Sequence, residues 1–173
     1  MKTPSLLVTL FLSFVLLGCG SEEASQQATM RQAVAIESAD ECHLCGMIIS
    51  NFPGPKGELY EKGKEEVKKF CSNRDLFTYL LQPENRRQVQ QVFVHDMTQV
   101  PWETPDDDLF IDAKSAWYVV GSSKKAAMGM AVASFSKEKH ARFFSDQFGG
   151  EVIRFDDITI DMLAMGSGMH MSH

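Results

Sequence analysis

Apolar residues recur along this chain in short alternating runs and in helical stripes, and two stretches carry the same order of elements. In each, a short strand that ends in Phe leads to a polar residue able to cap a helix, and then to a helix with one apolar stripe. We expect Gly149 to stop the second helix in the left-handed region. The predicted strand, cap and helix of the two stretches are 67–70, Ser72 and 73–81, and 132–135, Ser136 and 137–148.

The repeated order predicts an α+β fold of two small, related ββαβ-type halves with mostly antiparallel strands. We place these halves at residues 33–100 and 101–165. A short helix is expected to begin at Glu84. Further strands are predicted at 47–51, 92–97, 116–120 and 151–155.

The N-terminal segment has the pattern of an export signal that ends in a lipid attachment site. After Lys2, the apolar run from Leu6 to Leu17 is shorter than the roughly 20 residues that a membrane-spanning helix needs. It closes as Leu-Leu-Gly-Cys19, which looks like a bacterial lipobox. We therefore expect residues 1–18 to be a lipoprotein signal peptide. Residues 19–32, rich in Ser, Glu, Gln and Ala, would be the lipidated cysteine and a flexible tether.

The net charge and the number of cysteines limit the classes of function that the chain can have. The formal net charge of −6 becomes −7 when Lys2 leaves with the signal, which argues against a protein that binds nucleic acid. If Cys19 carries lipid, three of the four cysteines remain: Cys42, Cys45 and Cys71. An odd number cannot form a closed set of disulfides, so at least one thiol is available for chemistry, a metal or an outside partner.

The segment Cys42-His43-Leu44-Cys45-Gly46-Met47 is the strongest chemical signal, and five kinds of site could use it. Haem attachment is excluded, because it needs His after the second Cys, where Gly46 stands. A thioredoxin-like redox pair and a plain Cys42–Cys45 disulfide remain open. A zinc site would be incomplete, with only Cys71 and scattered histidines to add to the pair. The fifth kind is a copper(I) site.

Sulfur-rich elements favour copper(I), because thiolate and thioether ligands select this soft ion. On a strand, Cys45 and Met47 would face the same side, and Gly46 would let the backbone approach a bound ion. Met128-Gly129-Met130, predicted in an exposed loop, offers further thioethers. The Met/His-rich tail at 166–173 is similar to extracytoplasmic segments that bind copper, although chance composition of a terminal segment explains it as well.

Together these motifs resemble the NosL family, the copper-chaperone lipoproteins of nitrous oxide reductase maturation. The resemblance implies a Cu(I) carrier without catalytic activity, with a core similar to that of organomercurial lyase. It also implies a periplasmic location and a lipid anchor (palmitate), with the outer membrane favoured. The implied partners are nitrous oxide reductase and its maturation machinery in the membrane. The resemblance rests on Cys19, the Cys42-to-Met47 element, Val94-His95-Asp96 before Trp102, the run Asp112 to Val119, Met128-Gly129 before Phe135, and Phe148 to Val152.

The resemblance assigns copper binding to Cys45, Met47 and Met128. Asp96 could orient the neighbouring imidazole of His95 for a metal, and the alternative is that His95 is a surface or core polar residue on a strand. We expect Cys71 to be a buried strand-end cysteine. The secondary candidates for ligands are Cys42, His43, His95, Met130, Met169 and His170.

Other functions and assemblies stay open at this point. Cys42 and Cys45 could instead serve a periplasmic thiol–disulfide oxidoreductase or a lyase-like enzyme. A second, harder metal such as Zn(II) could bind at the histidines. The chain could act as a monomer or as a metal-bridged dimer.

Overall fold

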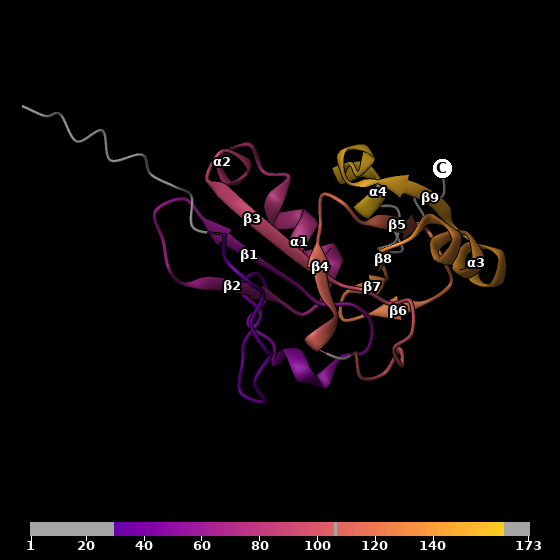
Figure 1. The fold of residues 1–173 in the computed structure, drawn as a ribbon, viewed down its shortest axis with the longest axis horizontal. Helices are drawn as coiled ribbons and strands as arrows, with labels where there is room; N and C mark the ends of the chain where they lie inside the picture. The colour runs from indigo at the N-terminus through magenta and orange to yellow at the C-terminus, as the bar shows by residue number, and fades with distance from the viewer. Residues whose placement is uncertain (1–29, 106, 165–173) are drawn as a thin grey trace, which may run out of the picture. The chain divides into compact units, whose positions relative to one another are not determined.

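Two antiparallel sheets with the same internal order dominate the computed structural model, which describes residues 30–105 and 107–164 (Figure 1). In both sheets the first strand along the chain lies in the centre, between the second and the third. The first sheet has the order β2-β1-β3-β4, with β1 Gly57–Glu61, β2 Val67–Phe70, β3 Val89–His95 and β4 Phe110–Asp112. The second has the order β8-β5-β9, with β5 Trp117–Val120, β8 Ala133–Phe135 and β9 Glu151–Arg154.

These sheets confirm the predicted α+β class with antiparallel strands. Each contains the expected ββαβ order, since helical residues connect the second strand to the third, in two helices in the first sheet and in one helix in the second. β4 lies in the range predicted for the second half but pairs with β3 of the first sheet. The boundaries of the two halves therefore stay a prediction. A separate hairpin joins β6 Lys125–Ala126 to β7 Gly129–Met130.

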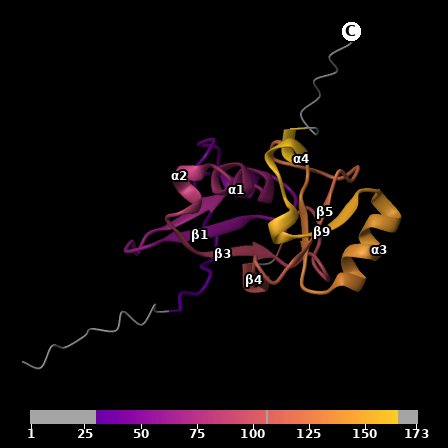
Figure 2. The ribbon, with the colours of Figure 1, turned by 90° about the horizontal axis from the view of Figure 1, so that it is seen from above.

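One helix lies against each sheet (Figure 2). Helix α1, Asn73–Leu80, begins after Ser72, whose hydroxyl accepts from the Asp75 N–H at 3.1 Å, so the predicted cap is confirmed. Helix α3, Glu138–Phe148, buries Ala141 and Phe144 against the second sheet. The remaining helical elements are α2 Pro83–Arg86, α4 Ile160–Ala164 and the short 3₁₀ turns η1 Ile49–Asn51, η2 Asp107–Leu109 and η3 Phe155–Asp157.

Three local predictions were wrong or incomplete. Residues 47–51 do not form a strand: only Ile48 makes an isolated bridge, to Glu41, before the η1 turn. Ser136 does not cap α3, because the N-cap is Lys137 and the Ser136 N–H instead donates to Asp96. Gly149 does end α3 with a positive φ of 72°, but its ψ of −173° is not that of a left-handed helix.

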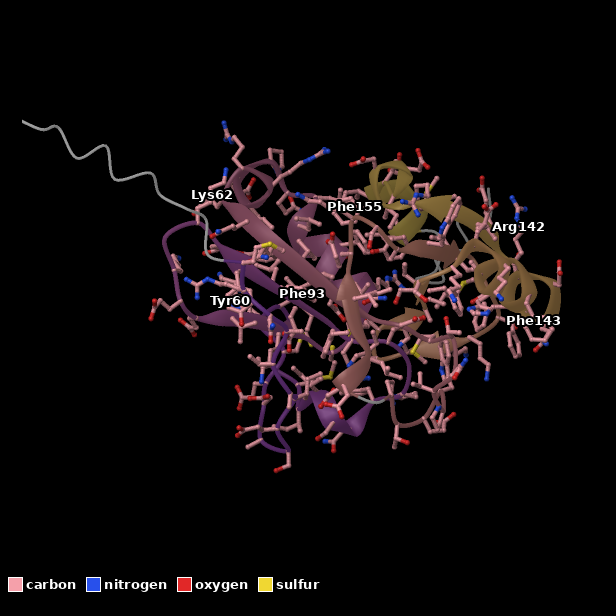
Figure 3. All side chains as sticks on the ribbon, viewed as in Figure 1. Tyr60, Lys62, Phe93, Arg142, Phe143 and Phe155 are labelled. Atoms are coloured by element: carbon pink, nitrogen blue, oxygen red, sulfur yellow. The ribbon has the colours of Figure 1, made fainter. Side chains whose placement is uncertain are left out.

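Strand β1 carries no clear sequence signal, yet it is the most buried strand of the first sheet. All five of its residues are buried, including Glu58 and Glu61. Its Leu59 face belongs to the core beneath α1, whereas residues 31–36 run over the opposite face, which carries Tyr60 and Phe93 (Figure 3). The sequence does not predict this strand, because two of its five residues, Glu58 and Glu61, are charged although the fold buries both.

The described helices include none that is long and apolar enough to cross a bilayer.

Candidate metal centre

Three thiols converge where the Cys42–Met47 loop meets the end of β2. The Sγ atoms of Cys42, Cys45 and Cys71 all lie within 4.8 Å of one another, and those of Cys45 and Cys71 are 3.5 Å apart. None of the three is in a disulfide. Cys42 and Cys71 are buried, at 2% and 0% exposure, whereas Cys45 is half-buried and forms the accessible side of the cluster.

The loop from Cys42 to Met47 closes on itself through its own backbone. The Cys42 N–H donates to the Met47 carbonyl, and the Gly46 N–H donates to the Cys42 carbonyl, both at 2.8 Å. Gly46 has a φ of 72°, a conformation that favours glycine. The His43 N–H donates to the Lys69 carbonyl at 2.8 Å and so fixes the loop against β2.

Cys71 enters the cluster because β2 ends directly before α1. The residue follows Phe70, the last residue of β2, and precedes Ser72, the N-cap of α1. Its Sγ lies 3.2 Å from Asp75 Oδ2, and the Ser72 hydroxyl donates to the same oxygen at 2.6 Å. The N-terminal end of a helix favours negative charge, so a thiolate in this cluster is stabilised there.

The three thiols differ in pKa. A hydrogen bond from the Cys71 thiol lowers the pKa of Cys42 to about 5, and N–H groups of Cys71, Cys45 and Leu44 add to this effect. The same interaction with Cys42, together with burial and the Asp75 carboxylate, raises the pKa of Cys71. Burial also raises the pKa of Cys45. At neutral pH the cluster therefore contains one thiolate, Cys42, beside two thiols.

The predicted thioethers lie in two different places. Met47 belongs to the closed loop and, like Cys45, packs at the margin of the first core. It does not share a strand face with Cys45, because residues 45–47 do not form a strand. Met128 is 46% exposed at the tip of the β6–β7 hairpin, and its carbonyl accepts from Arg74 Nη1 at 2.8 Å. Since Arg74 lies in the first turn of α1, this contact joins the hairpin to the helix that follows Cys71.

His43 is exposed on the loop and is engaged by Lys68. Its Nε2 lies 2.9 Å from Lys68 Nζ, and its ring packs edge-on to Tyr79 with 5.2 Å between centroids. Burial and the charge of Lys68 lower the pKa of His43, so the neutral ring accepts the hydrogen bond of the ammonium group. In this arrangement Lys68 occupies Nε2, one of the two ring nitrogens that could bind a metal.

His95 is buried in the first sheet, and both of its ring nitrogens have partners. Nδ1 accepts from the Lys56 N–H at 3.2 Å, so Nε2 carries the proton and donates to Asp107 Oδ1 at 3.0 Å. Of the two interpretations of His95, the structure confirms the core polar residue on a strand. Asp96 does not orient this ring, because its carboxylate accepts instead from the Thr98 and Ser136 N–H groups. His95 therefore has a structural role: its ring links the Lys56 backbone and the Asp107 side chain to β3.

Of the remaining candidate residues, the structure describes only Met130. Met130, half-buried in β7, lines a cavity of about 120 Å³ together with Arg74 and Met162. Cys19, Met169 and His170 lie outside the described residues.

Cys71 is the site residue whose part sequence reasoning missed. Its burial at a strand end was predicted correctly, but its position beside the Cys-x-x-Cys loop was not. The available signal was a third cysteine directly before a predicted helix cap, where the end of a strand can bring a side chain to a neighbouring loop.

The fold and the site together define a class: a small α+β protein with a thiol cluster suited to a soft metal ion. The sequence model of the NosL family, described as NosL, matches residues 33–163, and the chain belongs to this family. "Copper-binding lipoprotein NosL" of Stutzerimonas stutzeri is 47% identical over 163 residues, which are 94% of this chain and 84% of that protein. The protein of the same name in Achromobacter cycloclastes is 31% identical over 166 residues, with the same coverage.

A solved structure agrees with this assignment. The crystal structure of the copper chaperone NosL from Shewanella denitrificans matches with a TM-score of 0.75 and 57% identity, covering 76% of this chain and 98% of that one. The antiparallel fold is therefore that of a solved NosL structure.

Proposed function

We propose that this protein is a Cu(I) carrier which binds the ion at Cys42, Cys45 and Cys71 and delivers it to nitrous oxide reductase during assembly of its copper centres. The observation that carries the proposal is the convergence of three thiol sulfurs within 4.8 Å. The printed names of the relatives, copper-binding lipoprotein and copper chaperone, support the same metal.

The donor set suits Cu(I) better than the common alternatives. Thiolates favour soft ions, and Cu(I) is stable with two or three sulfur ligands. Structural Zn(II) sites use four nitrogen or sulfur ligands, whereas the described cluster brings together three thiols. Lys68 binds Nε2 of His43, and both ring nitrogens of His95 have partners. Zn(II) as a second metal therefore has less support than copper as the first.

The thioethers predicted from the family complete the proposed site. Cys45 is common to the thiol cluster and to the set Cys45, Met47 and Met128. Met47 lies two residues from Cys45 in the closed loop, and the hairpin of Met128 is joined to α1 through Arg74. Thioethers carry no charge and no proton, so they add a weak bond that an incoming ligand can replace.

Release of copper requires a ligand that a partner can reach. Cys45 is the half-buried member of the cluster, whereas Cys42 and Cys71 lie beneath it. An acceptor thiolate or imidazole would therefore displace Cys45 first and receive the ion by stepwise exchange. Because Cys45 and Cys71 carry protons at neutral pH, coordination by all three sulfurs releases two protons.

The location of the protein forms part of the same proposal. The lipobox ending at Cys19 and the word lipoprotein in the names of both relatives support a membrane-anchored protein that faces the periplasm. Anchoring in the outer membrane and a palmitate chain are the finer predictions. A tether of this kind would keep the carrier near a membrane-bound maturation machinery.

The decisive test is a Cu(I) titration of the reduced protein against a chromophoric Cu(I) chelator, with Zn(II) as competitor. We expect one tightly bound Cu(I) per chain that excess Zn(II) does not displace. X-ray absorption of the loaded protein should show a first shell of sulfur. A shell dominated by nitrogen or oxygen would contradict the proposed site.

One observation favours a second function, that of a thiol–disulfide oxidoreductase. The lowered pKa of Cys42 is typical of a nucleophilic cysteine. However, Cys42 is only 2% exposed, so a disulfide substrate cannot reach its sulfur in this conformation. Turnover of a model disulfide by the isolated protein would support the enzyme, and its absence together with Cu(I) binding would support the carrier.

A further inference from the structure

Lys56 lies opposite Cys71 at one end of the first sheet. The first residue of β1 pairs with the last residue of β2, and Lys56 and Cys71 are the next residues along these two chains (Figure 1). The chains stay together beyond this point, since the Asn73 N–H donates to the Pro55 carbonyl at 3.2 Å. Residues opposite each other in an antiparallel pair have side chains on the same face, with Cβ atoms about 5 Å apart. The Lys56 side chain therefore begins beside the thiol cluster.

The ammonium group of Lys56 is buried and has no carboxylate partner. The residue is 3% exposed, and its Nζ donates to the carbonyls of Phe52, Pro53 and Gly54 at 2.5, 3.1 and 3.0 Å. These bonds use all three N–H groups and fix the position of the charge. Within residues 30–105 and 107–164, none of the ion pairs involves Lys56. Because carbonyl dipoles solvate the charge without neutralising it, a buried positive charge remains.

The two lysines that precede Cys71 in β2 are already paired. Lys68 Nζ lies 3.2 Å from Glu61 Oε1. Lys69 Nζ lies 2.5 Å from Asp40 Oδ2. In each pair a carboxylate neutralises the ammonium group, so neither lysine offers the thiol cluster an unpaired positive charge.

Copper binding makes the proposed site more negative. Without metal, the cluster contains one thiolate, at Cys42. Three thiolates around one Cu(I) carry three negative charges and one positive charge, because coordination releases the protons of Cys45 and Cys71. The Asp75 carboxylate, with Oδ2 at 3.2 Å from Cys71 Sγ, repels a thiolate there. A site of this kind is stabilised by a nearby cation.

The charge of Lys56 is within electrostatic reach of Cys71. Burial lowers the pKa of Lys56 to about 8, so the ammonium form prevails at pH 7. Negative charge on Cys71 or on Asp107 acts against this lowering of the pKa. By the same interaction, a positive charge on Lys56 stabilises a thiolate at Cys71.

We propose that Lys56 is the internal counter-ion of the copper site: its ammonium group, fixed by three carbonyls, stabilises the negative charge that forms at Cys71 when Cu(I) binds. This inference rests on the proposed three-thiolate site. Lys56 is a positioning residue, because it acts through the Cys71 thiolate and forms no bond to the ion.

The first test removes the charge and keeps the length of the side chain. Lys56→Met should weaken Cu(I) binding on the order of tenfold in chelator competition, since an opposite charge at this range favours a thiolate by about one pKa unit or more. Lys62→Met is the matched control, because Lys62 lies at the other end of β1, is exposed and also donates to a backbone carbonyl, that of Arg87. It should bind Cu(I) as the wild type does. Thermal unfolding checks that each variant is folded.

A double-mutant cycle separates the charge from a structural effect. In a Cys71→Ser background the thiolate that Lys56 stabilises is gone, so Lys56→Met should change Cu(I) affinity less than about twofold. A disturbed loop at residues 52–54 would instead weaken binding equally in both backgrounds. Equal losses would therefore overturn the counter-ion role, as would wild-type Cu(I) affinity in the Lys56→Met protein.

Failure of the proposed function has a different signature. Absence of Cu(I) binding in the wild type, or wild-type affinity in the Cys71→Ser protein, would refute the three-thiolate site itself. A site that binds Cu(I), depends on Cys71 and does not respond to Lys56→Met would refute the counter-ion alone.

Discussion

The Sγ atom of Cys71 lies 3.5 Å from that of Cys45, although 26 positions separate the two residues along the chain. This proximity turns a two-cysteine motif into a three-thiol cluster. It depends on the turn from β2 into α1 and on the hydrogen bond between the His43 N–H and the Lys69 carbonyl.

Replacement of Cys71 should impair copper binding nearly as much as replacement of Cys45. We expect Cys45→Ala to abolish tight Cu(I) binding. We expect Cys71→Ala to weaken it by more than the roughly 10–100-fold that loss of a hydrogen-bond partner of a ligand costs. Chelator competition measures both, and thermal unfolding checks that each variant is folded. Wild-type Cu(I) affinity in the Cys71→Ala protein would show that Cys71 is a buried core residue and not a copper ligand.

The contribution of each thioether to Cu(I) affinity can be compared by replacing Met with Leu, which nearly preserves side-chain volume. Met47→Leu and Met128→Leu remove sulfur while keeping similar packing, so we expect weaker Cu(I) binding with little change in stability. Met130→Leu is the control, because Met130 lines the cavity beside Arg74 and Met162. Equal losses in all three variants would point to a general packing effect instead of direct bonds to copper.

Gly46 should matter through its backbone alone. Its φ is 72°, and a Cβ placed there would meet no heavy atom within 4 Å. Gly46→Ala should therefore reduce the free energy of unfolding by about 1–2 kcal/mol without a steric clash, and it should also weaken Cu(I) binding by disturbing the loop. Gly121→Ala is a matched control, since Gly121 has a φ of 78° and equally open surroundings. It should reduce stability similarly and leave copper affinity unchanged.

Glu58 should make the stability of the protein depend on pH. Burial raises the pKa of its carboxyl to about 7 from 4.5, and its Oε1 has no hydrogen-bond partner. A raised folded-state pKa means that the stability is fully present below about pH 4.5 and is lost as the pH rises through about 7. The shift corresponds to a decrease on the order of 3 kcal/mol. In urea unfolding at several pH values, Glu58→Gln should remove this decrease, whereas the exposed control Glu66→Gln should retain it.

His95 should contribute to stability and not to copper affinity. Both ring nitrogens are engaged in a buried setting, by the Lys56 N–H and by Asp107. His95→Phe leaves the buried Lys56 N–H unsatisfied, which costs about 1–3 kcal/mol, whereas Asp107 is 28% exposed and can bind water instead. Chelator competition should give wild-type Cu(I) affinity for the folded variant. A lower affinity together with a lost nitrogen signal in X-ray absorption would make His95 a ligand after all.

Prediction from the sequence succeeded where the signal was local. The helix after Ser72 and the helix before Gly149 were visible because apolar stripes, caps and glycine stops act within one or two turns. It failed for β1, where Glu58 and Glu61 looked solvent-exposed but are buried. It also failed for residues 47–51, whose Ile-Ile pair suggested a strand although they lie in a turn that packs on the core.

The sequence by itself determined the α+β class, the family and the importance of the motif from Cys42 to Met47, because these depend on residues close together in the chain. Only the tertiary structure decided that Cys71 joins this loop, that Asp107 and not Asp96 holds His95, and that Lys68 engages His43. The physical reason is that such contacts depend on where strands end and how layers pack. Spacing along a chain does not encode which distant side chains will meet.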